Sequence, residues 1–355
     1  MKVSNIRKKA LQLGLAAMLL LGAAAMPAPS VKADADAYER LALYFPADID
    51  DHWAYAELDN FVNADLLKGY VDHEGTVTVK PNQSISRAEF VALLVRALGL
   101  TEVRGEPAAF DDVAADQWYA EPVRIASSHG IVQGVEADRF GPDQRINRGE
   151  IATMVVRAFR STVDFSGEAV TFTDVPNYYA KPSIEAASRV GVVQGVSARE
   201  FKPYAPAKRA EAVVMLQRAL DLQAANLPDD AVLINVIAES EQESRLTANS
   251  QNFEYMKSLA GAYYDGYYEA LNMAFVQELA EMAKAGVTIK TEMTAIPHYT
   301  VLMNSTRFAV VEATGGQYRI ATNDNGIESV ETVPADAIYM LRKTNEGNWK
   351  IYASY

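Results

Sequence analysis

Apolar residues recur every three or four positions in three segments of the chain. The segments are SRAEFVALLVRALGL from Ser86, NRGEIATMVVRAF from Asn147 and KRAEAVVMLQRAL from Lys208, and each places its apolar side chains on one helical face. A second amphipathic pattern precedes each segment and is followed by a short extended stretch and a proline turn. The pattern therefore predicts three helical hairpins, each with a loop between its helices.

The three hairpins are copies of one unit. Arg87, Arg148 and Arg209 are spaced 61 residues apart, and an apolar residue and a proline precede each of them at constant distance. A period of this length, found three times, indicates a repeated supersecondary unit. The first copy has four extra residues, which we place in the loop-like stretch YVDHEGTVT. Each copy also has a glycine, at Gly69, Gly134 or Gly195. An aromatic residue precedes each glycine, at Trp53, Trp118 or Tyr179.

The second helix of each copy begins with a capping pattern. In the first two copies serine or asparagine stands three residues before a glutamate, as in a capping box. In the third copy Lys208 stands at the N-cap and offers no acceptor. The expected structural caps are Ser86, Glu89, Asn147, Glu150 and Glu211.

The repeated arginine sits in the first helical turn, where the helix dipole favours an acidic side chain instead. Its threefold repetition favours a bound anion, on which helix N–H groups and the guanidinium would converge. The alternative is an ion pair with a nearby aspartate, such as Asp48, Asp112 or Asp174, that only locks the fold. The aromatic residues Trp53, Trp118 and Tyr179 are second-rank site candidates, either as sugar-stacking platforms or as core residues.

The pattern changes after Leu220. Residues 225–230 predict a linker, and residues 231–355 begin with helical periodicity that Gly286 closes. The strand-like stretches VTIKTEMTAI, YTVLMNSTRFAVVEA, QYRIATN, AIYMLRKT and NWKIYASY follow, so an α+β domain is expected. His298, Asp265 and several tyrosines are its polar candidates, but the sequence has no metal cluster, phosphate loop or nucleophile motif there.

The N-terminal segment, the absence of cysteine and the net charge exclude several classes of protein and partner. Residues 1–33 combine a basic start, an apolar run and small residues, as in a cleaved secretory signal; an uncleaved membrane anchor would need a longer apolar run. The chain has no cysteine, which excludes disulfides, thiol chemistry and a cysteine-linked lipid. A net charge of −13 disfavours nucleic acid and anionic membranes as partners. An anionic ligand therefore requires a local positive site.

The motifs F-x-D-V, I-V-x-G, F-x-P and I-x-R-x-E before an apolar helix resemble the S-layer homology (SLH) repeat of bacterial cell-surface proteins. The repeats would span residues 41–101, 105–163 and 168–224. The resemblance implies an all-α, pseudo-threefold domain that binds secondary cell-wall polymer through a pyruvylated sugar. It also implies that the arginines contact the acid and that the three glycines shape the helix turns.

Departures from the family pattern accumulate along the chain. Asn147 and Lys208 replace a threonine, Gly149 replaces an alanine and Tyr179 replaces a tryptophan. We expect site quality to fall from the first repeat to the third, unless Lys208 serves as a second cation. In the C-terminal region, the order of elements with the phrases VQELAEMAKAGV, YMLRKT and NWKIYASY resembles an NTF2-like cone.

The sequence thus predicts a secreted, multidomain cell-surface protein in which SLH repeats bind pyruvylated polymer on peptidoglycan and display a small C-terminal binding or structural domain. No catalytic residue, metal or cofactor is expected. One alternative is a wall-anchored enzyme with its active site in the C-terminal cone, and another is an S-layer lattice component. Residues 34–224 and 231–355 are expected to fold independently.

Overall fold

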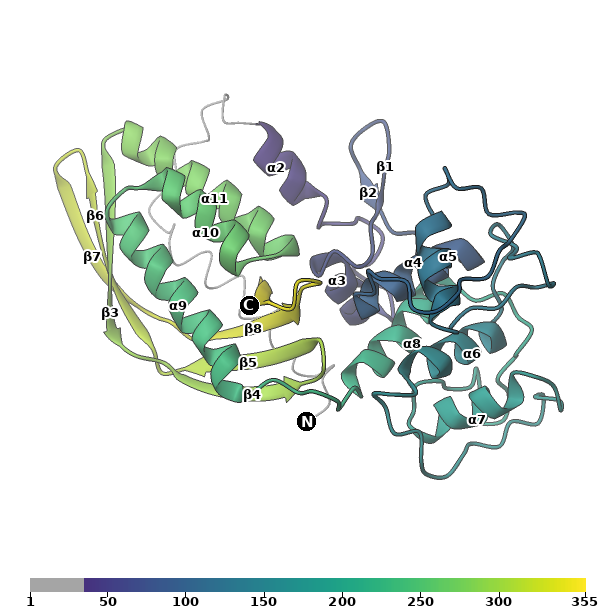
Figure 1. Ribbon diagram of the computed structural model, residues 1–355. Coiled ribbons are helices and arrows are strands. Elements are labelled where there is room, and N and C mark those ends of the chain that lie inside the picture. Colours follow the sequence, from purple (N-terminus) through teal and green to yellow (C-terminus); the bar gives the residue numbers. More distant parts are fainter. Residues whose placement is uncertain (1–34) are drawn as a thin grey trace.

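The computed structural model describes residues 35–355 (Figure 1). The predicted signal peptide, residues 1–33, lies outside the described residues. Within residues 35–355, no helix has the length and apolar character needed to cross a membrane. The first described element is α2 (Ala35–Ala42), which lies beside the helices of the C-terminal domain rather than with the repeats (Figure 1).

Each repeat contains the two predicted helices. The pairs are α3 (Tyr55–Asn63) with α4 (Arg87–Leu98), α5 (Ala120–Ser128) with α6 (Arg148–Phe159), and α7 (Lys181–Arg189) with α8 (Arg209–Asp221). The apolar face of each second helix is buried, as Phe90, Ile151 and Val213 illustrate, each 0% exposed. Burial of this stripe stabilises helices that would be marginal alone.

The expectation of an all-α repeat region is wrong. Strands β1 (Tyr70–Val71) and β2 (Val77–Thr78) form a short antiparallel pair in the first repeat. They occupy the stretch with the four extra residues and turn at Gly75, whose φ of 84° suits glycine. Each strand has only two residues, which is too few to show an alternation of apolar and polar positions, so the sequence predicted a loop here.

Backbone hydrogen bonds join the repeats in a cycle. Ile146 N–H donates to Ile85 O at 3.2 Å, Ala207 N–H to Ile146 O at 2.9 Å, and Ile85 N–H to Ala207 O at 3.1 Å. All three residues directly precede the N-caps of α4, α6 and α8. The starts of the three second helices are therefore brought together at one place.

The C-terminal domain places three helices against two antiparallel sheets (Figure 1). The helices are α9 (Asp230–Asn249), α10 (Phe253–Tyr263) and α11 (Gly266–Lys284). One sheet has the order β3-β6-β7 and the other β4-β5-β8-β9. The strands are β3 (Val287–Ala295), β4 (His298–Asn304), β5 (Phe308–Thr314), β6 (Gln317–Asp324), β7 (Ile327–Pro334), β8 (Ala337–Lys343) and β9 (Trp349–Ser354).

All five predicted strand-like stretches are present, and the second divides into β4 and β5. Strand β7 was not predicted, because IESVETVP is exposed at seven of its eight positions and has no apolar face to reveal it. The helices followed by antiparallel strands are present, whereas an NTF2-like cone stays a prediction.

The repeats and the C-terminal domain share one hydrophobic cluster. It includes repeat residues such as Leu58 and Phe61 and, from the C-terminal domain, Phe308, Val310 and Tyr352. A buried hydrogen-bond chain crosses the same contact, as described below for Asn60. The predicted linker separates the two parts along the chain, but they are packed against each other in space.

Candidate functional site

The three repeated arginines are buried between repeats. Their side chains are 4%, 6% and 7% exposed, and in each case Nη1 meets the capping-box glutamate of the following repeat. The pairs are Arg87–Glu150 at 2.7 Å, Arg148–Glu211 at 2.5 Å and Arg209–Glu89 at 3.0 Å. The alternative prediction was an ion pair that locks the fold, and ion pairs of this type are present. Their partners are glutamates of another repeat, however, and not the nearby aspartates.

Backbone carbonyls accept from the remaining guanidinium nitrogens. Arg87 donates from Nε to Phe140 O at 3.0 Å and from Nη2 to Gln133 O at 3.1 Å. Arg148 makes the same two bonds, to Phe201 O and Gln194 O. Burial lowers the pKa of Arg87, against the opposing effect of Glu150. Each nitrogen of these two guanidinium groups thus donates to a protein group.

Arg209 is held less completely. Its Nε donates to Val79 O at 2.9 Å, but its Nη2 makes no hydrogen bond to any described residue. Its Cζ lies 5.2 Å from the ring centroid of Tyr70, an exposed residue of β1. The third arginine therefore keeps a donor that the other two have used.

The N–H groups at the helix starts also have partners. Arg87 N–H and Ala88 N–H donate to loop carbonyls of the second repeat, and Glu89 N–H donates to Ser86 Oγ at 3.2 Å. The Glu89 carboxylate accepts from Ser86 N–H at 2.8 Å, which completes the box. Helix N-termini normally leave such donors free for an anion, whereas here neighbouring repeats satisfy them.

The other two starts follow the same scheme with one difference. Asn147 Oδ1 accepts from Glu150 N–H at 2.9 Å, and Glu150 accepts from Asn147 N–H. At Lys208 only the glutamate half exists: Glu211 accepts from Lys208 N–H at 2.8 Å, while an ammonium group has nothing to accept with. The Lys208 side chain is exposed and free for another role.

The aspartates have a separate task. Asp48, Asp112 and Asp174 each accept two backbone N–H groups from the loop before the second helix; Asp112 accepts from Phe140 at 2.7 Å and Gly141 at 2.8 Å. Burial acts to raise the pKa of Asp112, but these backbone bonds outweigh it and lower the pKa. The aspartates hold the loops whose carbonyls receive the arginines.

The three repeated aromatics are surface residues. Trp53, Trp118 and Tyr179 are 65%, 61% and 63% exposed, so they are not core side chains. Tyr179 of the third repeat lies within electrostatic range of Arg87 and Glu150: partial burial and Glu150 raise its pKa, and Arg87 opposes this. An exposed aromatic residue thus lies within electrostatic range of an arginine and a glutamate from the other two repeats.

The three glycines lie in tight backbone turns. A Cβ at Gly134 or Gly195 would collide with the carbonyl oxygen two residues further on. At Gly69 it would lie 2.6 Å from Val77 Cγ1 in β2. These glycines allow the close approach that the turns require.

Four cations gather where the third repeat meets the first. We define this junction cluster as Lys80, Arg145, Lys208 and Arg209. Lys80 Nζ lies 4.2 Å from the Tyr70 ring centroid, and Tyr70 in turn donates to Glu89 at 2.8 Å. Arg145 and Lys208 are exposed and meet at Ser84: Arg145 Nη1 donates to Ser84 O at 2.8 Å, and Ser84 forms a β-bridge with Lys208.

Sequence reasoning missed Lys80, Arg145 and Tyr70. Lys80 recurs as Lys202 in the third repeat, so the 61-residue period could have singled it out. Arg145 diverges between copies, since its position is Ser84 in the first repeat and Pro206 in the third. A search for repeated residues discards such positions.

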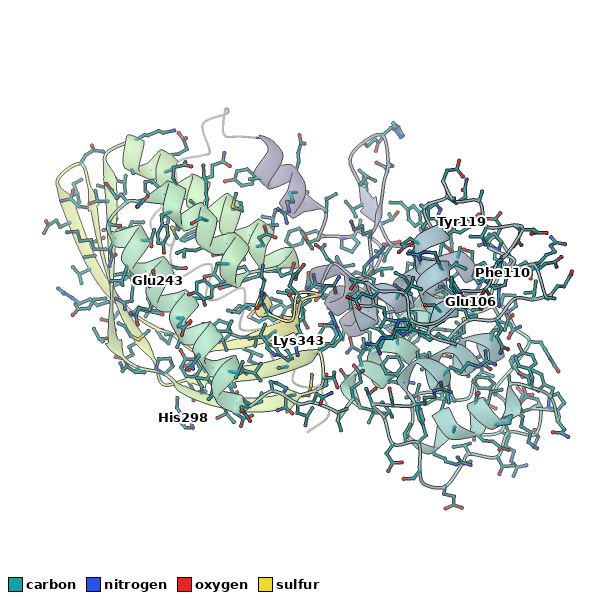
Figure 2. The ribbon with its side chains drawn as sticks, viewed as in Figure 1. Glu106, Phe110, Tyr119, Glu243, His298 and Lys343 are labelled. Atoms are coloured by element: carbon teal, nitrogen blue, oxygen red, sulfur yellow. The ribbon has the colours of Figure 1, made fainter. Side chains whose placement is uncertain are left out.

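The polar candidates of the C-terminal domain do not converge. His298 is exposed at the start of β4, on the rim of the domain (Figure 2). Asp265 caps α11 and pairs with Arg342 at 2.5 Å. In residues 35–355, no three His, Asp or Glu side chains are placed to hold a metal ion.

The repeated units match a known protein family. The S-layer homology domain family matches residues 109–152 and 171–213, in the second and third units. These two segments are therefore S-layer homology domains, and over this region the chain is similar to proteins of the bacterial cell surface. The first unit lies outside the matched ranges but occupies the equivalent place in the cycle of contacts.

Three curated relatives illustrate the range of such proteins. The surface-layer 125 kDa protein of Lysinibacillus sphaericus is 31% identical over 48% of this chain and 14% of its own length. The cellulosome-anchoring protein of Acetivibrio thermocellus is 27% identical over 45% of this chain and 36% of its own. The amylopullulanase of Thermoanaerobacterium thermosulfurigenes is 29% identical over 49% of this chain and 9% of its own. This chain thus matches only a minor part of each relative.

Among solved structures, the chain is similar to the intermembrane space region of the chloroplast protein ARC6, at 16% identity over 36% of this chain and 95% of that one. The TM-score of 0.29 is too low to support an argument about the fold.

Proposed function

We propose that the SLH repeats anchor this protein non-covalently to the bacterial cell wall by binding secondary cell-wall polymer on peptidoglycan, with the C-terminal domain displayed outside the cell. The junction cluster carries this proposal. It brings four cations together, of which Arg209 pairs with Glu89, on a chain whose net charge is −13. Relatives named for surface layers and for cellulosome anchoring support the same role.

The proposed ligand is an acidic glycan such as a pyruvylated sugar. Its carboxylate would accept from the free Nη2 of Arg209 and from Lys208, because charge-assisted hydrogen bonds suit a planar acid. Tyr179 lies near Arg87 and Glu150, which belong to the other two repeats. The equivalent aromatic residue for Arg209 and Glu89 is Trp118 of the second repeat, and its ring would stack against the sugar beside Arg209. Arg87 and Arg148, whose donors are engaged, would mainly hold the repeats in place.

This proposal reverses the expected order of the sites. The sequence expectation ranked the third arginine last, because Lys208 leaves its helix without a side-chain cap. We propose that this junction binds best, because the same lysine supplies an exposed cation and Arg209 keeps a free donor. Pseudo-threefold assembly would then place three similar sites of unequal strength around one axis.

We further propose that the protein is not an enzyme. The alternative of a wall-anchored enzyme would need an active site in the C-terminal domain, whereas the similarity to amylopullulanase lies in the SLH region. A role as an S-layer lattice component is the second alternative, and sheet-like self-assembly of the purified protein would favour it.

The test is sedimentation of the purified protein with cell-wall sacculi that retain or lack the polymer. The double variant Arg145→Gln, Lys208→Gln should bind polymer-containing sacculi at least about tenfold more weakly, since it removes the proposed Lys208 contact and a neighbouring cation of the cluster. The matched control is Arg124→Gln, Arg160→Gln, which removes the same charge from arginines outside the cluster. Equal loss in both doubles would show that net charge alone governs binding, and the cluster would not be the site.

A further inference from the structure

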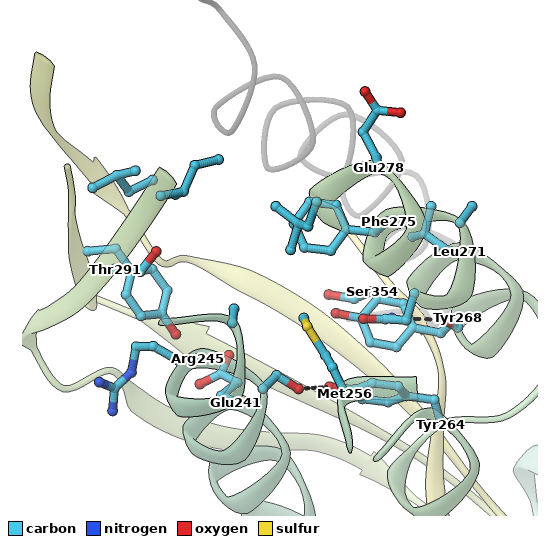
Figure 3. A pocket seen from close by; sticks show the side chains of 18 of the residues that line it. Glu241, Arg245, Met256, Tyr264, Tyr268, Leu271, Phe275, Glu278, Thr291 and Ser354 are labelled. Carbon is cyan, nitrogen blue, oxygen red and sulfur yellow. Dashed lines mark hydrogen bonds between the residues drawn. The ribbon is translucent and has the colours of Figure 1, made fainter. Parts of the chain in front are cut away.

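A cavity of about 540 Å³ lies in the C-terminal domain. Helices α9, α10 and α11 form one wall and strands β3, β6 and β8 the other (Figure 3). Tyr38 and Leu41 of α2 also line the cavity. The volume falls in the range of sites that enclose small organic molecules. None of the SLH site candidates contributes to its lining.

Most of the wall is apolar. Met256 of α10, Phe275 and Leu279 of α11, Ile289 of β3 and Ile320 of β6 face the cavity. Figure 3 shows Phe275 and Leu271 across the cavity from Glu241 and Arg245. An apolar ligand body would therefore lie along α10 and α11, at the far side from the polar residues.

The polar end is built by α9. Glu241 and Arg245 stand one helical turn apart and both line the cavity. The Glu241 carboxylate accepts from the hydroxyls of Tyr299, at 3.0 Å, and Tyr339, so each of its oxygens has a partner. Burial raises the pKa of Glu241, against the opposing effect of the two tyrosines.

Arg245 is not satisfied in this way. Its Nε is buried and has no hydrogen-bond partner among the described residues. Tyr318, which also lines the cavity, makes no hydrogen bond through its hydroxyl within residues 35–355 either. A buried donor without an acceptor is uncommon in a native protein and calls for an explanation such as an absent ligand.

We infer that this cavity binds an amphiphile with a single apolar chain and a terminal acyl oxygen, which accepts from Arg245 and Tyr318. The buried Nε of Arg245 calls for an acceptor at the head of the ligand, and the hydroxyl of Tyr318, within electrostatic range of Arg245, offers a second donor to it. A cationic head would meet the Arg245 guanidinium, and Glu241 is already engaged by two tyrosines. A free carboxylate and an acyl ester share this chemistry, and the guanidinium favours the carboxylate.

The helix α2 closes part of the same site. Tyr38 donates to Glu278 of α11 at 3.2 Å, and Arg40 pairs with Glu269 of α11 at 2.8 Å. The described chain that precedes the repeats thus contributes Tyr38 and Leu41 to the wall of the cavity.

The test is calorimetric titration of the full chain with three probes of equal chain length: dodecanoate, methyl dodecanoate and dodecylamine. We expect dodecanoate to bind at one site per chain, the ester to bind more weakly, and the amine to bind at least tenfold more weakly than dodecanoate. Arg245→Gln should reduce dodecanoate binding at least tenfold and abolish the preference for the acid over the ester. Ala248→Phe, on the cavity side of α9, should block all probes.

Arg319→Gln is the matched control, because Arg319 is an exposed arginine of β6 outside the cavity. It should leave all three affinities unchanged. Circular dichroism and thermal unfolding of each variant separate lost binding from lost folding, and Arg245→Lys, which keeps the charge but has no Nε, provides a second reading. Stronger binding of dodecylamine, absence of binding by every probe, or dodecanoate binding that survives both Arg245→Gln and Ala248→Phe would overturn the inference.

Discussion

At the scale of single residues, the repeated arginines could be identified from the local sequence, but their partners could not. Their position in the first turn of three helices was readable from the sequence, and so was their importance. The partner of Arg87 was not, because Glu150 is 63 residues away and belongs to the next repeat. Dipole reasoning assumed free N–H groups at the helix start, whereas the backbone of a neighbouring repeat occupies them.

This geometry predicts that Arg87→Lys destabilises the protein. A lysine keeps the charge but cannot serve Glu150, Phe140 O and Gln133 O together, so buried acceptors lose their donor. The expected loss in the free energy of unfolding is about 1 to 3 kcal/mol. Denaturant titration of the full chain, followed by circular dichroism, measures it.

Arg209→Lys is the internal comparison, because Arg209 serves one backbone carbonyl rather than two. We expect it to cost less stability than Arg87→Lys but more affinity for polymer-containing sacculi. The opposite pattern, with Arg87→Lys fully stable and unable to bind, would restore Arg87 as a ligand contact of the kind that the sequence first indicated.

At the scale of elements, most helices and strands were predictable because each carries its own apolar stripe or alternation. The capping boxes at Ser86 and Asn147 are local as well, and both are formed. Gly149 is different: helix propensity makes it a cost in α6, but a Cβ there would collide with the Tyr178 hydroxyl. That contact belongs to the next repeat and leaves no trace in the local sequence.

We therefore predict that Gly149→Ala lowers the stability of the protein, by roughly 1 to 3 kcal/mol, the range for an overpacked site. The double variant Gly149→Ala, Tyr178→Phe should recover part of this loss, because the hydroxyl is the atom that a Cβ would meet. Gly261→Ala in α10 is the control: nothing lies within 4 Å of its added Cβ, so helix propensity should stabilise it by up to about 1 kcal/mol. A stabilising Gly149→Ala would show that Tyr178 yields at no cost.

At the scale of the whole molecule, the change of pattern after Leu220 identified a second region, but composition could not show that the two regions pack together. Tyr352 of β9 donates to Asn60 of α3 at 2.7 Å, and Asn60 donates to Gln217 of α8 at 2.5 Å. All three lie within the shared core, and Gly266 approaches Asn63 so closely that a Cβ would collide with its carbonyl. This contact coincides with the break between α10 and α11, which the sequence predicted as one continuous apolar stripe.

The shared core predicts coupled unfolding, in contrast to the independent folding expected from the linker. Asn60→Leu, a change within the repeats, removes one buried hydrogen bond from the hydroxyl of Tyr352 and one from the amide of Gln217, at a cost of about 1 to 3 kcal/mol. Trp349 of β9 is buried, whereas Trp53 and Trp118 are exposed, so the fluorescence change on unfolding reports mainly on the C-terminal domain. We expect the fluorescence midpoint to shift together with the circular dichroism midpoint of the whole chain. The control Asn82→Leu, at an exposed position of the same repeat, should move neither. A fluorescence midpoint that stays at its original value while the dichroism midpoint falls would mean that the C-terminal domain folds on its own and that the repeats merely rest against it.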